Sequence, residues 1–137
     1  MKKNFLIMLF LLFLAGCGSF YDGLMTQCHY VVVNGTDENG TFKMVYKDGW
    51  IFAEGEIKNN KKDGWWTYYR KGGSIDSRRL FEEGKWNGHM IVFYENRQMA
   101  CKGVNDVINP SSKVKPEYFN PDGNPITEEE YYKNITS

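Results

Sequence analysis

The sequence predicts a mainly β protein: an antiparallel meander of repeated β-hairpins in a single twisted sheet, with a short C-terminal helix. Nine Phe, nine Tyr and four Trp among 137 residues are too apolar a set for a disordered chain, and 14 Gly are too many for a helical bundle. A 24-residue period runs through the middle of the chain. The length allows one domain.

The first 16 residues have the pattern of an export signal that is cleaved. A basic start, Lys2 and Lys3, precedes an apolar run from Phe5 to Leu14. At ~1.5 Å per residue this run spans roughly half of a ~30 Å hydrocarbon layer, which argues against a permanent transmembrane helix.

The residues Leu14-Ala15-Gly16-Cys17 resemble the lipobox of bacterial lipoproteins. The resemblance implies that Cys17 carries acyl chains such as palmitate and becomes the new N-terminus, so that the lipid bilayer is one partner. Each buried CH₂ contributes ~0.8 kcal/mol, and two or more chains anchor a protein firmly. We therefore expect a lipid-anchored, extracytoplasmic protein of the cell membrane with residues 17–27 as its lipidated tether. Gly18 favours the outer membrane if the bacterium has two membranes.

The repeat is anchored by Gly40, Gly64 and Gly88. The second place after each holds Phe42, Trp66 and Met90, and the fifteenth holds Gly55, Arg79 and Gly103. Turn-like strings precede each anchor at 36–39, 60–63 and 84–87, so each unit reads as strand, turn, strand, turn. The expected strands are 28–33, 41–47, 50–57, 65–70, 74–82, 89–94 and 97–103.

All four Pro lie between 110 and 125, which predicts the end of the repeat domain, residues 28–103. Residues 104–137 form a Pro-containing tail that is expected to be loop from 105 to 125. Thr127 and Glu130 match a capping box, so a short helix is expected near 128–133.

Two segments resemble a known family. They are Gly64-Trp65-Trp66-Thr67-Tyr68-Tyr69 with Gly73, and Gly84-Lys85-Trp86-Asn87-Gly88. They look like the MORN-repeat variant of bacterial proteins often labelled YwqK-type antitoxin-like, over roughly residues 35–103. The resemblance implies a MORN-like single twisted sheet. A cytoplasmic antitoxin role conflicts with the export signal.

Alternation along the strands gathers an aromatic face, defined here as Phe42, Tyr46, Trp66, Tyr68 and Tyr94. A face of this size on one sheet is expected to be covered. Either the tail covers it, through Val114, Tyr118, Phe119, Ile126, Tyr131 and Tyr132, or a partner binds there.

Catalytic and metal chemistry find no support in the sequence. His29 and His89 have no metal-ligand spacing, and no phosphate loop or nucleophile elbow occurs, so we expect no enzyme, no metal and no cofactor. Seventeen basic and 17 acidic residues give no field that attracts nucleic acid. The basic cluster Arg70, Lys71, Arg78 and Arg79 serves either solubility or contact with anionic lipid head groups.

A disulfide between Cys28 and Cys101 is doubtful. In a flat meander their strands lie six spacings of ~4.8 Å apart, about 29 Å, whereas a disulfide requires Cα atoms within ~7 Å. Free thiols are favoured unless the first strand folds back beside the last.

These observations predict a membrane-anchored, non-enzymatic binding or interaction module of the cell envelope, which presents an aromatic face or an edge to an envelope protein. The alternative is an envelope-glycan-binding lipoprotein that uses exposed Trp50, Trp65, Trp66 and Trp86 together with Tyr side chains.

Replacing Cys17 with Ala is expected to abolish acylation and to leave the precursor unprocessed, because the thiol is the acylated group. Metabolic labelling with a radioactive fatty acid and mass measurement of the membrane fraction would show this. Normal cleavage and acylation of Cys17→Ala would contradict the lipobox interpretation.

Overall fold

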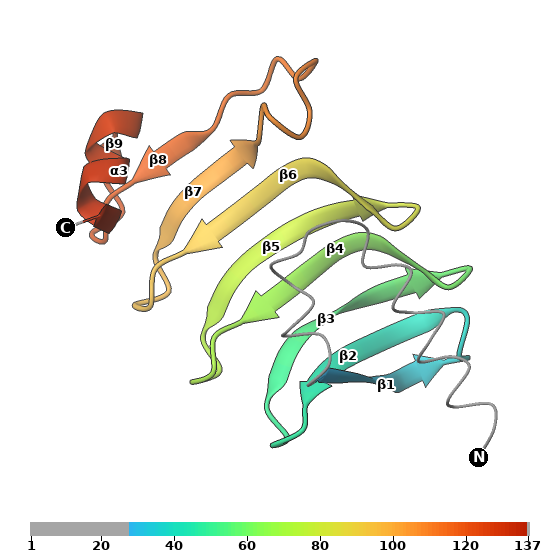
Figure 1. Cartoon of the computed structure of the whole chain (residues 1–137). Helices are drawn as coiled ribbons and strands as arrows, with labels where there is room; N and C mark the ends of the chain where they lie inside the picture. Colours follow the sequence, from blue (N-terminus) through green and yellow to red (C-terminus); the bar gives the residue numbers. More distant parts are fainter. Residues whose placement is uncertain (1–27, 137) are drawn as a thin grey trace.

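The computed structural model describes residues 28–136, which form one open antiparallel sheet of nine strands in sequential order, followed by a helix (Figure 1). This confirms the predicted fold class. The elements are β1 (Cys28–Gly35), β2 (Gly40–Tyr46), β3 (Ile51–Lys58), β4 (Lys61–Tyr69), β5 (Ile75–Glu82), β6 (Lys85–Phe93), β7 (Met99–Val104), β8 (Glu117–Phe119), β9 (Pro125–Ile126) and α3 (Glu128–Thr136). The predicted signal peptide, Cys17 and the tether lie outside the described residues.

Two hairpin turns are shorter than expected. The turn residues are Asn59-Asn60, with φ of 50° and 63°, and Glu83-Gly84, with φ of 48° and 86°. Two residues with positive φ close a hairpin whose twist matches that of its strands. The prediction of turns over 60–63 and 84–87 was therefore wrong: β4 and β6 begin at Lys61 and Lys85 rather than at 65 and 89.

Two of the three anchoring glycines, Gly64 and Gly88, lie in bulges just after these turns. Glu54 pairs with Thr67 and Glu56 pairs with Asp63, so Gly55 faces the extra residues of β4. Gly64 has a φ of 77° and Gly88 has a φ of 95°, conformations that suit glycine.

The sheet does not end near residue 104. After the loop 105–116, β8 and β9 add a fourth hairpin, and its turn repeats the hydrogen bonds of the earlier ones: Asn120 donates to the Asn124 carbonyl as Tyr46 does to the Trp50 carbonyl. The expectation of loop from 105 to 125 is confirmed for residues 105–116 and for the turn 120–124, but it was wrong for β8 and for the start of β9. Proline is tolerated here because Pro125 lies on the edge strand, where no further ladder partner follows.

The predicted capping box is present. The Thr127 backbone N–H donates to Glu130 Oε2 (2.8 Å), and the Glu130 N–H donates to Thr127 Oγ1 (3.2 Å). The Thr127 N–H and the Thr127 hydroxyl (2.9 Å) both donate to the Glu130 carboxylate, and these two bonds hold the pKa of Glu130 below its ordinary value. The helix that follows extends to Thr136, beyond the predicted end near 133.

The core lies within one face of the sheet. A row of paired residues crosses all nine strands: Tyr30, Met44, Ala53, Tyr68, Ser77, Val92, Cys101, Tyr118 and Ile126. The buried small residues Ala53, Ser77 and Cys101 alternate with larger ones. Large side chains therefore cover the small residues beside them.

Glycine at the fifteenth place allows a second kind of packing. The Trp66 ring lies against Gly55, since a Cβ there would come within 2.7 Å of the indole. The Pro116 backbone occupies the equivalent space at Gly103 (2.6 Å). These two glycines are needed for close approach.

Gly55→Ala is expected to destabilise the fold by about 1–3 kcal/mol, because the new methyl overlaps the buried Trp66 ring. Urea unfolding followed by circular dichroism measures this change. Gly72→Ala is the matched control, since a Cβ there meets nothing within 4 Å and its φ is not positive. Equal stability of the two variants would contradict the packing argument.

Candidate functional site

The aromatic face is partly core. Trp66 and Phe42 are 0% and 2% exposed, so neither can contact a partner, and the prediction that both belong to a binding face was wrong. Tyr46, Tyr68 and Tyr94 are half-buried. Tyr46 stacks on Trp50 with ring centroids 4.1 Å apart, and the Tyr94 hydroxyl donates to the Phe119 carbonyl (2.8 Å).

The tail does not cover the cluster around Trp66. Among the described residues, the partly buried apolar side chains packed on this cluster come from β1, β3, β4 and β5: Cys28, Tyr30, Phe52, Tyr68 and Phe81. The tail packs on itself and on the last strands, where the ring of buried Tyr118 lies 4.9 Å from that of Tyr131. Val114 is exposed. The predicted tail lid was therefore wrong for this region.

Cys28 and Cys101 are both free thiols, on β1 and β7 of the sequentially ordered sheet. Burial raises the pKa of the Cys101 thiol to about 11, with a smaller contribution from the Glu128 carboxylate. The pKa of Cys28 is also raised, chiefly by burial. Neither thiol is activated for nucleophilic chemistry.

The basic cluster predicted from the sequence is divided between different surroundings. Arg70 pairs with Asp76 (3.1 Å), and Lys71 lies 3.9 Å from Asp48. Arg78 and Arg79 are consecutive in β5 and therefore lie on opposite faces. The Arg78 guanidinium lies over the Trp65 ring (5.7 Å).

Arg79 instead joins Lys62, which sequence reasoning missed. Both cations lie over the Tyr68 ring, Lys62 Nζ at 5.3 Å and the Arg79 guanidinium at 5.2 Å from its centroid. We call these two residues the cation pair. Lys62 also faces Trp66 (4.3 Å) and Phe81 (5.0 Å), and Arg79 faces Trp86 (5.2 Å). The sequence offered one signal for this site, because Arg79 stands at the fifteenth place of the repeat, where the other copies have Gly55 and Gly103.

The electrostatic state of Lys62 is unusual. Its ammonium donates to the Tyr68 hydroxyl (3.1 Å), and within residues 28–136 neither member of the cation pair forms an ion pair. Burial, followed by the nearby positive charge of Arg79, lowers the pKa of Lys62 to about 7. This site therefore carries positive charge at a cost to the fold.

The two edges of the sheet differ. β1 is eight residues long and has no charged residue, and its Val31, Val32 and Val33 are 40%, 38% and 52% exposed. β9 has only two residues and lies beside α3 (Figure 1). A long, apolar edge strand is a template for pairing with another strand.

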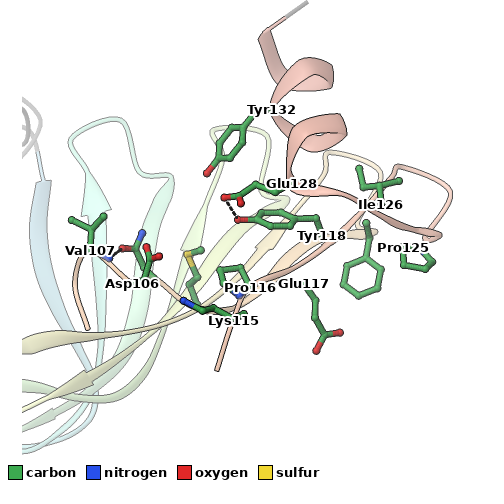
Figure 2. Close-up of a pocket in the computed structure, with 13 residues that line it drawn as sticks. Asp106, Val107, Lys115, Pro116, Glu117, Tyr118, Pro125, Ile126, Glu128 and Tyr132 are labelled. Atoms are coloured by element: carbon green, nitrogen blue, oxygen red, sulfur yellow. Dashed lines mark hydrogen bonds between the residues drawn. The ribbon is translucent and has the colours of Figure 1, made fainter. Parts of the chain in front are cut away.

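A pocket of about 620 Å³ lies between the last strands, the loop 105–116 and α3. Figure 2 shows Glu128 and Tyr132 from α3 on one side and Asp106 and Val107 from the loop on the other. The Tyr118 hydroxyl donates to Glu128 (3.0 Å) inside it.

The four tryptophans do not form one surface. Trp66 is fully buried, whereas the consecutive residue Trp65 is 38% exposed on the opposite face. The Trp86 indole N–H donates to the His89 carbonyl (2.9 Å). The alternative prediction, glycan binding by four exposed tryptophans, was wrong for Trp66, because its buried indole cannot stack on a sugar ring.

Within residues 28–136 no group of three His, Cys, Asp or Glu side chains is placed to hold a metal ion. No helix in this part of the chain is long and apolar enough to cross a membrane. Comparison with protein-family models and with curated proteins finds no match to this chain.

Lys62→Met is expected to stabilise the fold most at low pH. Because the pKa of Lys62 in the folded protein, about 7, lies below its ordinary value of 10.5, the unfolded chain binds more protons between these values. The stability of the native protein therefore rises as pH increases from 7 to 10.5. The destabilisation of the native protein by Lys62 is therefore fully present below pH 7 and absent above pH 10.5. Lys62→Met removes this dependence, whereas the control Lys61→Met, at an exposed position, keeps it. Urea midpoints at pH 6 and pH 10 measure it, and parallel pH profiles of native protein and Lys62→Met would refute it.

Proposed function

We propose that the chain is a membrane-anchored, non-enzymatic interaction module of the cell envelope that binds an envelope protein along β1. The observation that carries the proposal is that β1 is an edge strand of the sheet formed by residues 28–136, with exposed Val31, Val32 and Val33. A partner that supplies an extended segment adds a tenth strand to the sheet, through main-chain hydrogen bonds.

The composition of β1 supports this function. Natural sheets protect an exposed edge with charges, proline or very short strands. β1 has no such protection, because its sequence Cys-His-Tyr-Val-Val-Val-Asn-Gly contains neither proline nor a carboxylate, lysine or arginine. The other edge is protected, since β9 is short and contains Pro125.

The position of β1 along the chain also supports the proposal. The first described residue, Cys28, begins β1 and lies ten residues beyond Gly18, so a lipid on Cys17 would hold this edge within ~33 Å of the bilayer. A partner that docks there would be held close to the same membrane.

Val32→Lys is expected to reduce capture of the partner at least tenfold, because a charged side chain on the edge opposes strand addition. The measurement is crosslinking in intact cells followed by mass spectrometry of copurified envelope proteins. Val107→Lys is the matched control, since Val107 is an exposed valine in the loop 105–116, away from β1. The same crosslinks in both variants would exclude the β1 edge as the binding surface.

A further inference from the structure

The geometry points to a carboxylate-binding site formed by the cation pair, Lys62 and Arg79, on the face of the sheet. Its ligand class is a single carboxylate on an apolar or aromatic body, such as the C-terminus of a peptide. This site is separate from the β1 edge and does not depend on the function proposed for that edge.

Both members of the cation pair have unused hydrogen-bonding capacity within residues 28–136. The Arg79 guanidinium has five N–H donors, and its contacts in the described part of the chain are with the Tyr68 and Trp86 rings. Lys62 uses one of three donors, toward the Tyr68 hydroxyl. A guanidinium that lies over an aromatic face keeps N–H donors at its edge, which can meet a carboxylate in bidentate geometry.

The two members of the cation pair are like charges that lie over the same aromatic ring. Two cations within 5.3 Å of one ring centroid repel each other, whereas Arg70 and Lys71 of the basic cluster have carboxylate partners and Arg78 lies over Trp65 on the opposite face. Burial is the larger cause of the lowered pKa of Lys62, and the positive charge of Arg79 lowers it further. An anion bound between the two groups would offset the repulsion and favour protonated Lys62.

The cation pair coincides with a break in the repeat. The fifteenth place holds Gly55 and Gly103 in the outer copies, where a flat group packs directly on the strand, but Arg79 in the middle copy. Lys62 lies at the place where the other copies have Glu38 and Trp86. Both cations therefore occur together in the copy that lacks glycine at the fifteenth place.

The surroundings favour a carboxylate over phosphate or a lipid surface. Both cations are half-buried against aromatic rings, so a strongly hydrated dianion would lose much of its water on entering. A membrane surface would contact extended, exposed cations instead. A planar monoanion with an apolar body fits this site best.

The test is binding of N-acetylphenylalanine to the full chain in detergent, followed by calorimetry and by NMR of labelled lysine side chains. We expect saturable binding and a rise in the pKa of Lys62, whereas N-acetylphenylalanine amide, which lacks the carboxylate, gives neither. N-acetylglutamate amide tests whether an acidic side chain serves as well as a C-terminus.

Lys62→Gln and Arg79→Gln are each expected to weaken binding about tenfold or more, since each removes charge-assisted hydrogen bonds. Lys61→Gln is the matched control and should bind as the native chain does. Arg79→Lys keeps the charge but loses the planar fork, so it should fold normally and bind more weakly than native protein.

Two results would overturn the proposal. One is the absence of any Lys62 response to N-acetylphenylalanine in folded protein. The other is equal or tighter binding of inorganic phosphate or of vesicles with anionic lipid, which would identify a phosphate or membrane site.

Discussion

A single open sheet has no second layer, so its core must be built from side chains on one face, and this constraint governs the rest of the structure. Large side chains on one strand cover small residues on the next, as Trp66 covers Gly55 and as Met44 and Tyr68 flank Ala53. The strict 24-residue period keeps large residues beside small ones in successive hairpins. The bulges at Gly64 and Gly88 take up the extra residues that follow the two-residue turns, so that large residues still lie opposite small ones on the neighbouring strand.

The same constraint makes the ends of the sheet special, because each end has a neighbour on only one side. At the C-terminal end, the rings of Tyr118 and Tyr131 pack together, and α3 lies against β8. At the other end, β1 has β2 on one side and exposed valines. This asymmetry is the reason that the proposed partner strand is assigned to β1, the described strand nearest in sequence to the proposed lipid anchor.

The repeat also makes its exceptions informative. A regular copy would have glycine at position 79, with a neighbouring ring lying flat on it, as at Gly55. Arg79 gives up that packing and adds charge beside Lys62, whose ammonium is already costly to bury. Departures from a locally consistent pattern concentrate at functional sites, which is why the cation pair is of more interest than the regular aromatic stripe.

The features that depend on local chemistry could be predicted from the sequence. The hairpins of residues 28–103 and the capping box of Thr127 and Glu130 follow from turn residues, alternation and short-range hydrogen bonds. The fourth hairpin escaped prediction because β8 and β9 have three and two residues, and the loop 105–116 interrupts the period.

Which aromatic residues are buried and which cations lie together could be seen only in the folded protein. Alternation places Trp66 and Tyr68 on one face, but the burial of Trp66 depends on Gly55, which belongs to a different hairpin strand. Lys62 and Arg79 are 17 positions apart, and they meet because the register of β4 against β5 brings both onto the Tyr68 ring. Periodicity specifies a residue's face, whereas its surroundings depend on strand register and bulges, which are set by the packing of the whole sheet.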